Sequence, residues 1–149
     1  MSSFYLIGSL RNPEVPLLAN YLRANEVSVF DSWYAAGPVA DDSWQAYEKE
    51  KGLTYEEALA GYAAQHVCEF DKRHLDASVG GILLMPAGKS GHLELGYILG
   101  QRKPGYVLFD KEPERWDVMY NLATDVFFDK ADLLDTLIAG RVGVYADAR

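Results

Sequence analysis

Short apolar runs that end in small or polar residues recur along the chain, and they predict five buried strands. They lie at 4–7, 27–30, 79–85, 106–109 and, more weakly, 126–128. Successive residues in these runs are apolar, and they lack the apolar–polar alternation of a strand that has one solvent-exposed face. Such strands are typical of a parallel sheet whose two faces are both covered.

Segments with apolar residues at helical spacing alternate with these runs and predict the covering helices. They are 13–25, 54–77, 92–102 and a last helix that begins at 129 and ends at Gly140. Thr54 and Glu57 open the second of them as a capping box. The order predicts an α/β fold, a flavodoxin- or Rossmann-like doubly wound sheet of five parallel strands with helices on both faces.

The same pattern predicts one domain over residues 1–140. Segment 33–52 is less regular, with a possible short helix at 44–50, and we interpret it as an insertion or a lid. Residues 141–149 are interpreted as a tail. The length of 149 residues is that of one ordinary domain.

Charge and cysteine content narrow the function classes. The formal net charge of −8 argues against a nucleic-acid polymer or an anionic membrane surface as partner, but a local site can still hold a single nucleotide. Cys68 is the single cysteine, so a disulfide framework is excluded and a reducing compartment, the cytoplasm, is expected. The N-terminal residues lack the pattern of a secretion signal, and no apolar run has the length of a membrane span.

The strand–turn–helix around residues 80–97 is the most specific local feature. The strand breaks into the turn 86–91, and the following helix carries Glu94 near its expected first turn. In a flavodoxin-like sheet the first and third strands are neighbours, so this turn meets the one after the first strand at the ligand-binding edge. The residues that would meet there are Gly8, Ser9, Arg11, Gly88, Lys89 and Ser90. Their cations and the helix N–H groups suit an anion such as a phosphate.

Other interpretations of these residues are open at this level. A glutamate in a first helical turn is often only a partner of the helix dipole. Gly88–Ser90 resembles the end of a P-loop, but the glycine required five residues earlier is Leu83, so that motif is rejected. The histidines and Cys68 do not have metal-ligand spacing, so no metal is expected. No other cofactor is expected either. Tyr5 would ordinarily be a core residue and Asp71 a solvated one.

Several motifs, in the right order over most of the chain, resemble the nucleoside 2-deoxyribosyltransferase family, which includes 2'-deoxynucleoside 5'-monophosphate N-glycosidases. They are segment 4–11, Glu69–Asp71, the Glu-Leu-Gly core of 88–96, Lys103–Pro104 and 119–121. The resemblance implies that Glu94 is a nucleophile that attacks the anomeric carbon of deoxyribose. It implies that Tyr5 orients Glu94, and that Asp71 assists at the sugar or the leaving base.

The resemblance also implies a homodimer or higher homo-oligomer with shared sites, in which the Asn121 region enters the neighbouring site. Gly88 stands where the transferases have an aspartate and the glycosidases a serine, and Ser90 is the candidate substitute. The Gly-Ser-x-Arg turn is closer to the monophosphate branch. Nucleoside or monophosphate, and transfer or hydrolysis, therefore stay open, and so does binding of a nucleotide without turnover. Asp31 and Trp33, with the aromatic residues of 33–52, are expected to recognise the base or to pack.

Overall fold

The computed structural model describes residues 2–147 and contains one parallel five-stranded sheet in the order β2-β1-β3-β4-β5. The strands are β1 (Phe4–Ile7), β2 (Val29–Phe30), β3 (Gly80–Leu84), β4 (Gly105–Leu108) and β5 (Asp125–Phe127). The helices are α1 (Glu14–Ala24), α2 (Ala40–Glu50), α3 (Tyr55–Leu59), α4 (Tyr62–Ala77), α5 (Lys89–Gly100) and α6 (Lys130–Asp147). Short 3-10 helices, η1 (Ser32–Ala36) and η2 (Val118–Leu122), complete the elements. This confirms the predicted doubly wound α/β fold.

Two apolar layers enclose the sheet, as the uninterrupted apolar strands predict. On one face Leu6 and Ile82 pack with residues of α1 and α6. On the other face Tyr5 and Leu83 pack with residues of α4 and α5. Successive residues of each strand therefore enter opposite cores, which is why every position in β3 is buried.

Glycines at the contact between α5 and the sheet allow a close approach. A Cβ on Gly91 would lie 3.1 Å from Leu83 Cδ1 and 3.3 Å from Ile7 Cγ2. A Cβ on Gly105 would lie 2.8 Å from Leu95 Cδ1. Because these positions lack side chains, α5 sits directly on β1, β3 and β4, and a residue of α5 can reach a side chain of β1.

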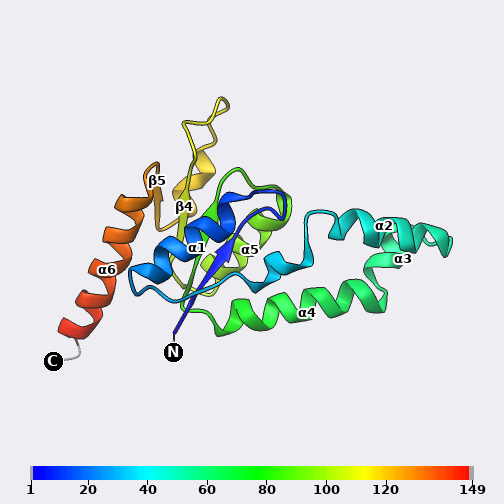
Figure 1. The fold of residues 1–149 in the computed structure, drawn as a ribbon, viewed down its shortest axis with the longest axis horizontal. Coiled ribbons are helices and arrows are strands. Elements are labelled where there is room, and N and C mark those ends of the chain that lie inside the picture. The colour runs from blue at the N-terminus through cyan, green and yellow to red at the C-terminus, as the bar shows by residue number, and fades with distance from the viewer. Residues whose placement is uncertain (1, 148–149) are drawn as a thin grey trace.

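Segment 33–52 is largely helical and lies outside the sheet. It comprises most of η1 and all of α2, which is longer than the short helix expected at 44–50. Figure 1 shows α2 and α3 side by side beyond the sheet, on the side away from α6, with the long helix α4 returning from them to the sheet. We call α2, α3 and the first half of α4 the arm.

The predicted helix 54–77 is wrong as a single element, because the chain bends at Ala60 and Gly61. The capping box at Thr54 and Glu57 forms as expected and opens α3, but α3 lasts only until Leu59. The Gly61 N–H donates to the Ala58 carbonyl, and Gly61 takes an extended conformation as the N-cap of α4. An extended residue cannot continue the helical hydrogen bonding, so two helices form.

Two other helix ends differ from the predictions. Helix α5 begins at Lys89 and not at 92, because the Gly88 carbonyl already accepts the His92 N–H. Helix α6 passes Gly140 and continues to Asp147, so most of the expected tail is helical and only 148–149 lie outside the described residues. A glycine weakens a helix by about 1 kcal/mol but does not by itself end one. Within residues 2–147, no helix is long and apolar enough to cross a membrane.

Candidate functional site

Three predicted catalytic residues come together from three elements: Glu94 of α5, Tyr5 of β1 and Asp71 of α4. The Tyr5 hydroxyl hydrogen-bonds the Glu94 carboxylate, and Asp71 is close enough to act on Glu94 by its charge. Because α5 begins at Lys89, Glu94 lies in the second turn, and the first turn has no acidic residue. The interpretation of Glu94 as a simple helix-dipole partner therefore loses its basis, because that effect is confined to the first turn.

Burial and a neighbouring like charge make the Glu94 carboxylate hard to ionise. Removal from water is the main cause and the charge of Asp71 the second, and together they raise its pKa from 4.5 to about 7. The hydrogen bond from Tyr5 opposes them. Tyr5 itself is 1% exposed, and its burial, with the two nearby carboxylates, raises its pKa strongly, so the hydroxyl stays protonated and donates.

Asp71 is the second carboxyl group with an altered protonation equilibrium. Its partial burial raises its pKa, while the nearby His74 lowers it. The His74 ring is fixed by a hydrogen-bond contact of 2.9 Å between Nδ1 and the Phe70 carbonyl oxygen. Two carboxyl groups whose pKa values are raised in one site are typical of acid–base or nucleophilic chemistry.

An aromatic cluster borders these carboxyl groups. Phe30, at the end of β2, stacks on His74 with ring centroids 4.1 Å apart and also contacts Tyr5 at 5.4 Å. Phe70 contacts His74 at 4.5 Å and Phe30 at 6.3 Å. None of these three rings was predicted as a site residue. The one signal was Phe70, which had been interpreted as part of one face of the predicted helix 54–77.

A cleft opens where the turns after β1 and β3 meet. Its volume is about 370 Å³, and its lining includes three predicted residues, Ser9, Arg11 and Gly88. Asn12, Pro13, Pro86 and Ala87 line the rest. Helix α5 begins at this cleft, directly after Gly88. At a rise of 1.5 Å per residue, Glu94 lies roughly 9 Å along the helix from Gly88. Lys89 and Ser90 are exposed on the first turn of α5 and do not line the cleft.

Arg11 is held at the mouth of this cleft by the arm. Its guanidinium group forms an ion pair with Asp42 of α2 at 2.8 Å and also donates to the Pro38 carbonyl oxygen at 3.5 Å. Both partners of the ion pair are largely exposed, so the pair is weak and an anion can compete for Arg11.

Two residues that follow β2, Asp31 and Trp33, were predicted to recognise a base, but both bind other residues of the protein. Asp31 forms an ion pair with Arg23 of α1. The indole N–H of Trp33 donates to the Leu6 carbonyl oxygen at 2.7 Å, and its ring packs against both apolar layers. The packing interpretation of Trp33 therefore accounts for its contacts.

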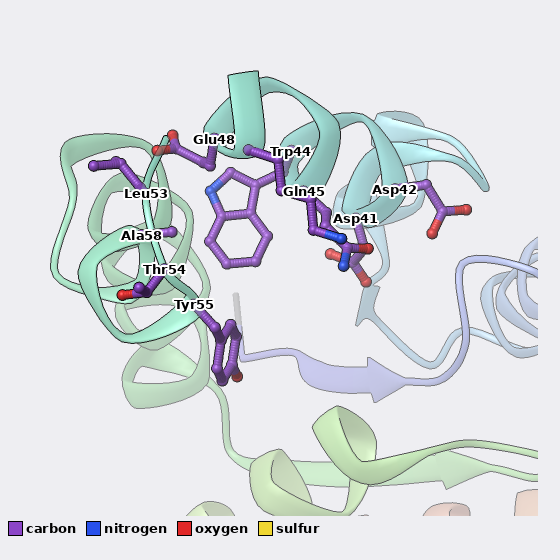
Figure 2. Close-up of a pocket in the computed structure, with 10 residues that line it drawn as sticks. Asp41, Asp42, Trp44, Gln45, Glu48, Leu53, Thr54, Tyr55 and Ala58 are labelled. Atoms are coloured by element: carbon purple, nitrogen blue, oxygen red, sulfur yellow. The ribbon is translucent and has the colours of Figure 1, made fainter. Parts of the chain in front are cut away.

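The arm contains a pocket of its own, of about 260 Å³, between α2 and α3. Figure 2 shows the indole of Trp44 above the ring of Tyr55, and these rings meet edge to face at 6.4 Å. The Glu48 carboxylate is nearly buried and lies 3.2 Å from the Lys51 ammonium group. The lining includes neither Glu94, Tyr5 nor Asp71, so this pocket is distinct from the carboxylate site.

Asn121 lies exposed in η2, next to a residue that ties this segment to α5. The Tyr120 hydroxyl hydrogen-bonds Nε2 of His92 at 2.8 Å, while Nδ1 of His92 contacts the Gly88 carbonyl oxygen at 2.7 Å. The large apolar side chains around Asn121 are exposed: Trp116, Val118, Met119 and Leu122.

No family model matches this chain, and a search of curated proteins finds no match.

Proposed function

We propose that the protein cleaves the N-glycosidic bond of 2'-deoxyribonucleosides, with Glu94 as the nucleophile. The single observation that carries this proposal is the set of Glu94, Tyr5 and Asp71, in which a desolvated carboxylate accepts a hydrogen bond from a buried tyrosine beside a second carboxyl group. Each of the three residues lies in a motif that resembles the nucleoside 2-deoxyribosyltransferase family.

The chemistry follows from the protonation states. A Glu94 oxygen attacks the anomeric carbon, the carbon–nitrogen bond breaks, and its electron pair leaves with the base. The carboxylate stabilises the oxocarbenium-like charge that develops on the sugar. Asp71, with its raised pKa, can hold the proton that the leaving base takes. Tyr5 keeps a hydrogen bond to the carboxyl group and orients it. A second base or water then attacks the glycosyl ester and frees Glu94.

The cleft beside α5 supports a 5'-monophosphate as an alternative substrate. Arg11 and the α5 N-terminus are groups that bind phosphate, and the cleft lies along the same helix as Glu94. Binding of a nucleotide without turnover is the second candidate function, which Arg11 and the cleft would equally support.

Chromatography of deoxynucleosides and their 5'-monophosphates, with and without a free acceptor base, separates these functions. New nucleoside that forms only with the acceptor indicates a transferase. Free base that forms without an acceptor, and faster from the monophosphate, indicates a hydrolase. Tight binding with no base release over long incubation indicates the binding module. Glu94→Gln should lower turnover by several orders of magnitude, because it removes the covalent route.

We also propose that the protein is a homo-oligomer, because four large apolar side chains are exposed in the segment around Asn121. Light scattering on the purified protein should give at least a dimer. A monomer at the concentrations of the activity assay would contradict a site shared between subunits.

A further inference from the structure

An aromatic ring remains exposed to solvent beside the carboxyl groups. Phe70 is 39% exposed although it belongs to the cluster with Phe30 and His74. His74, which the Phe70 ring contacts, is close enough to Asp71 to act on it by its charge. A large apolar ring next to paired carboxyl groups is the arrangement that a site needs when its ligand has a flat apolar part joined to a polar one.

The contacts place this ring at the right part of the site. Phe70 contacts Phe30, Phe30 contacts Tyr5, and Tyr5 donates to Glu94, so two ring contacts separate Phe70 from the residue that holds the nucleophile. In a displacement at the anomeric carbon, the base leaves on the side opposite to the attacking carboxylate. Glu94 lies on α5, whereas Phe70 and Asp71 lie on α4. The nucleophile and the two α4 residues can therefore contact a substrate from different helices.

The ring is also held in place before any ligand arrives. His74 stacks on Phe30 with an interplanar angle of 12°, and its Nδ1 contacts the carbonyl oxygen of Phe70 one turn earlier. Phe70 therefore has a rigid backing, and little side-chain entropy is lost when a flat group stacks on it.

Other aromatic residues are less suited to this task. The Trp33 indole is bonded to Leu6 and packed, and the Tyr120 hydroxyl is bonded to His92. Trp44 and Tyr55 line the arm pocket, which shares no lining residue with the carboxylate site.

We propose that Phe70 is the stacking surface for the nucleobase of the substrate, with Asp71 at the edge of the bound base. This inference rests on the proposed function and names its base subsite. It places base recognition on α4 and not in segment 33–52, for which base recognition and packing had both been open. Figure 1 shows that α4 runs from α2 and α3 to the sheet.

The test measures binding separately from turnover. In the Glu94→Gln background, equilibrium binding is measured for deoxyadenosine and its 5'-monophosphate, and for 1,2-dideoxyribose 5-phosphate, which has the sugar and phosphate but no base. Phe70→Ala should weaken binding of the nucleoside and its monophosphate roughly ten- to hundredfold. It should leave binding of the baseless sugar phosphate unchanged. Phe70→Trp should retain nucleoside binding, because it keeps a stacking face.

Tyr62→Ala is the matched control. Tyr62 lies two turns earlier on α4, is 84% exposed and stacks on His66, so its loss should not change binding. Equal losses of nucleotide and baseless ligand with Phe70→Ala would mean a structural role and would overturn the inference, as would unchanged binding. If the parent protein cleaves deoxynucleosides while Phe70→Ala has no effect, only the base subsite is wrong. If it neither cleaves nor binds them, the proposed function fails as well.

Discussion

The replacement of Glu94 by glutamine should stabilise the fold, and the gain should depend on pH. The pKa of Glu94 is about 7 in the folded protein against 4.5 for an ordinary glutamate. Between these values the folded state holds a proton that the unfolded chain releases. Stability from this group is therefore full below the unfolded pKa and is lost as pH rises through the folded one. At 1.36 kcal/mol per pKa unit, the loss at alkaline pH is about 3 kcal/mol.

Glutamine cannot ionise but keeps an oxygen that accepts the Tyr5 hydrogen bond. We therefore expect the free energy of unfolding of Glu94→Gln, measured by urea denaturation, to exceed that of the parent by about 3 kcal/mol at about pH 8 and to be nearly equal to it at about pH 4. Glu69→Gln, on the exposed side of α4, is the control for loss of one negative charge and should show no such dependence. A stability change for Glu94→Gln that is the same at both pH values would refute the assignment of a desolvated carboxylate.

Two further predictions concern the pH dependence of catalysis and the packing of glycines in the sheet and in α5. If Glu94 must be ionised to react, kcat/KM should fall as pH drops through about 7. Tyr5→Phe should shift this acidic limb upward because a donor is lost, and Asp71→Asn should shift it downward because a like charge is lost. Shifts in the same direction would contradict the electrostatic account. In denaturant melts, Gly80→Ala should destabilise by about 1–3 kcal/mol, because its Cβ would lie 2.6 Å from a backbone oxygen. Gly96→Ala, with nothing within 4 Å, should stabilise α5 by about 0.5–1 kcal/mol.

The fold could be predicted because its main signal is local. Apolar runs such as 4–7 and 80–84 mark strands buried on both faces, and the sheet order follows from the usual winding of such units. The break at Gly61 was missed because the helical pattern of α3 and α4 continues across it. The start of α5 was missed because its first turn contains small residues that mark a turn equally well.

The site could be predicted only in part. The motifs singled out Glu94, Tyr5 and Asp71 as candidates, but their proximity depends on how α4 and α5 pack on the sheet, which requires contacts far apart in sequence. The pairing of Arg11 with Asp42, 31 residues away, has no local signal. The same is true of the stacking of Phe30 on His74, because it depends on how α4 docks beside β2.

Burial and a neighbouring like charge disfavour the ionised Glu94 carboxylate, and this supports a functional interpretation. Tyr5, which hydrogen-bonds Glu94, belongs to the apolar layer that also contains Leu75 and Leu95. Residues that reduce stability while retaining a charge in a buried position are common at active sites.

Mass spectrometry of the protein after incubation with a 2'-deoxynucleoside tests the central claim most directly. The account predicts free base in solution and a 2-deoxyribosyl ester on the peptide that contains Glu94, with neither product from Glu94→Gln. Free base released equally by Glu94→Gln, or no base released from any deoxynucleoside or its 5'-monophosphate, would contradict it.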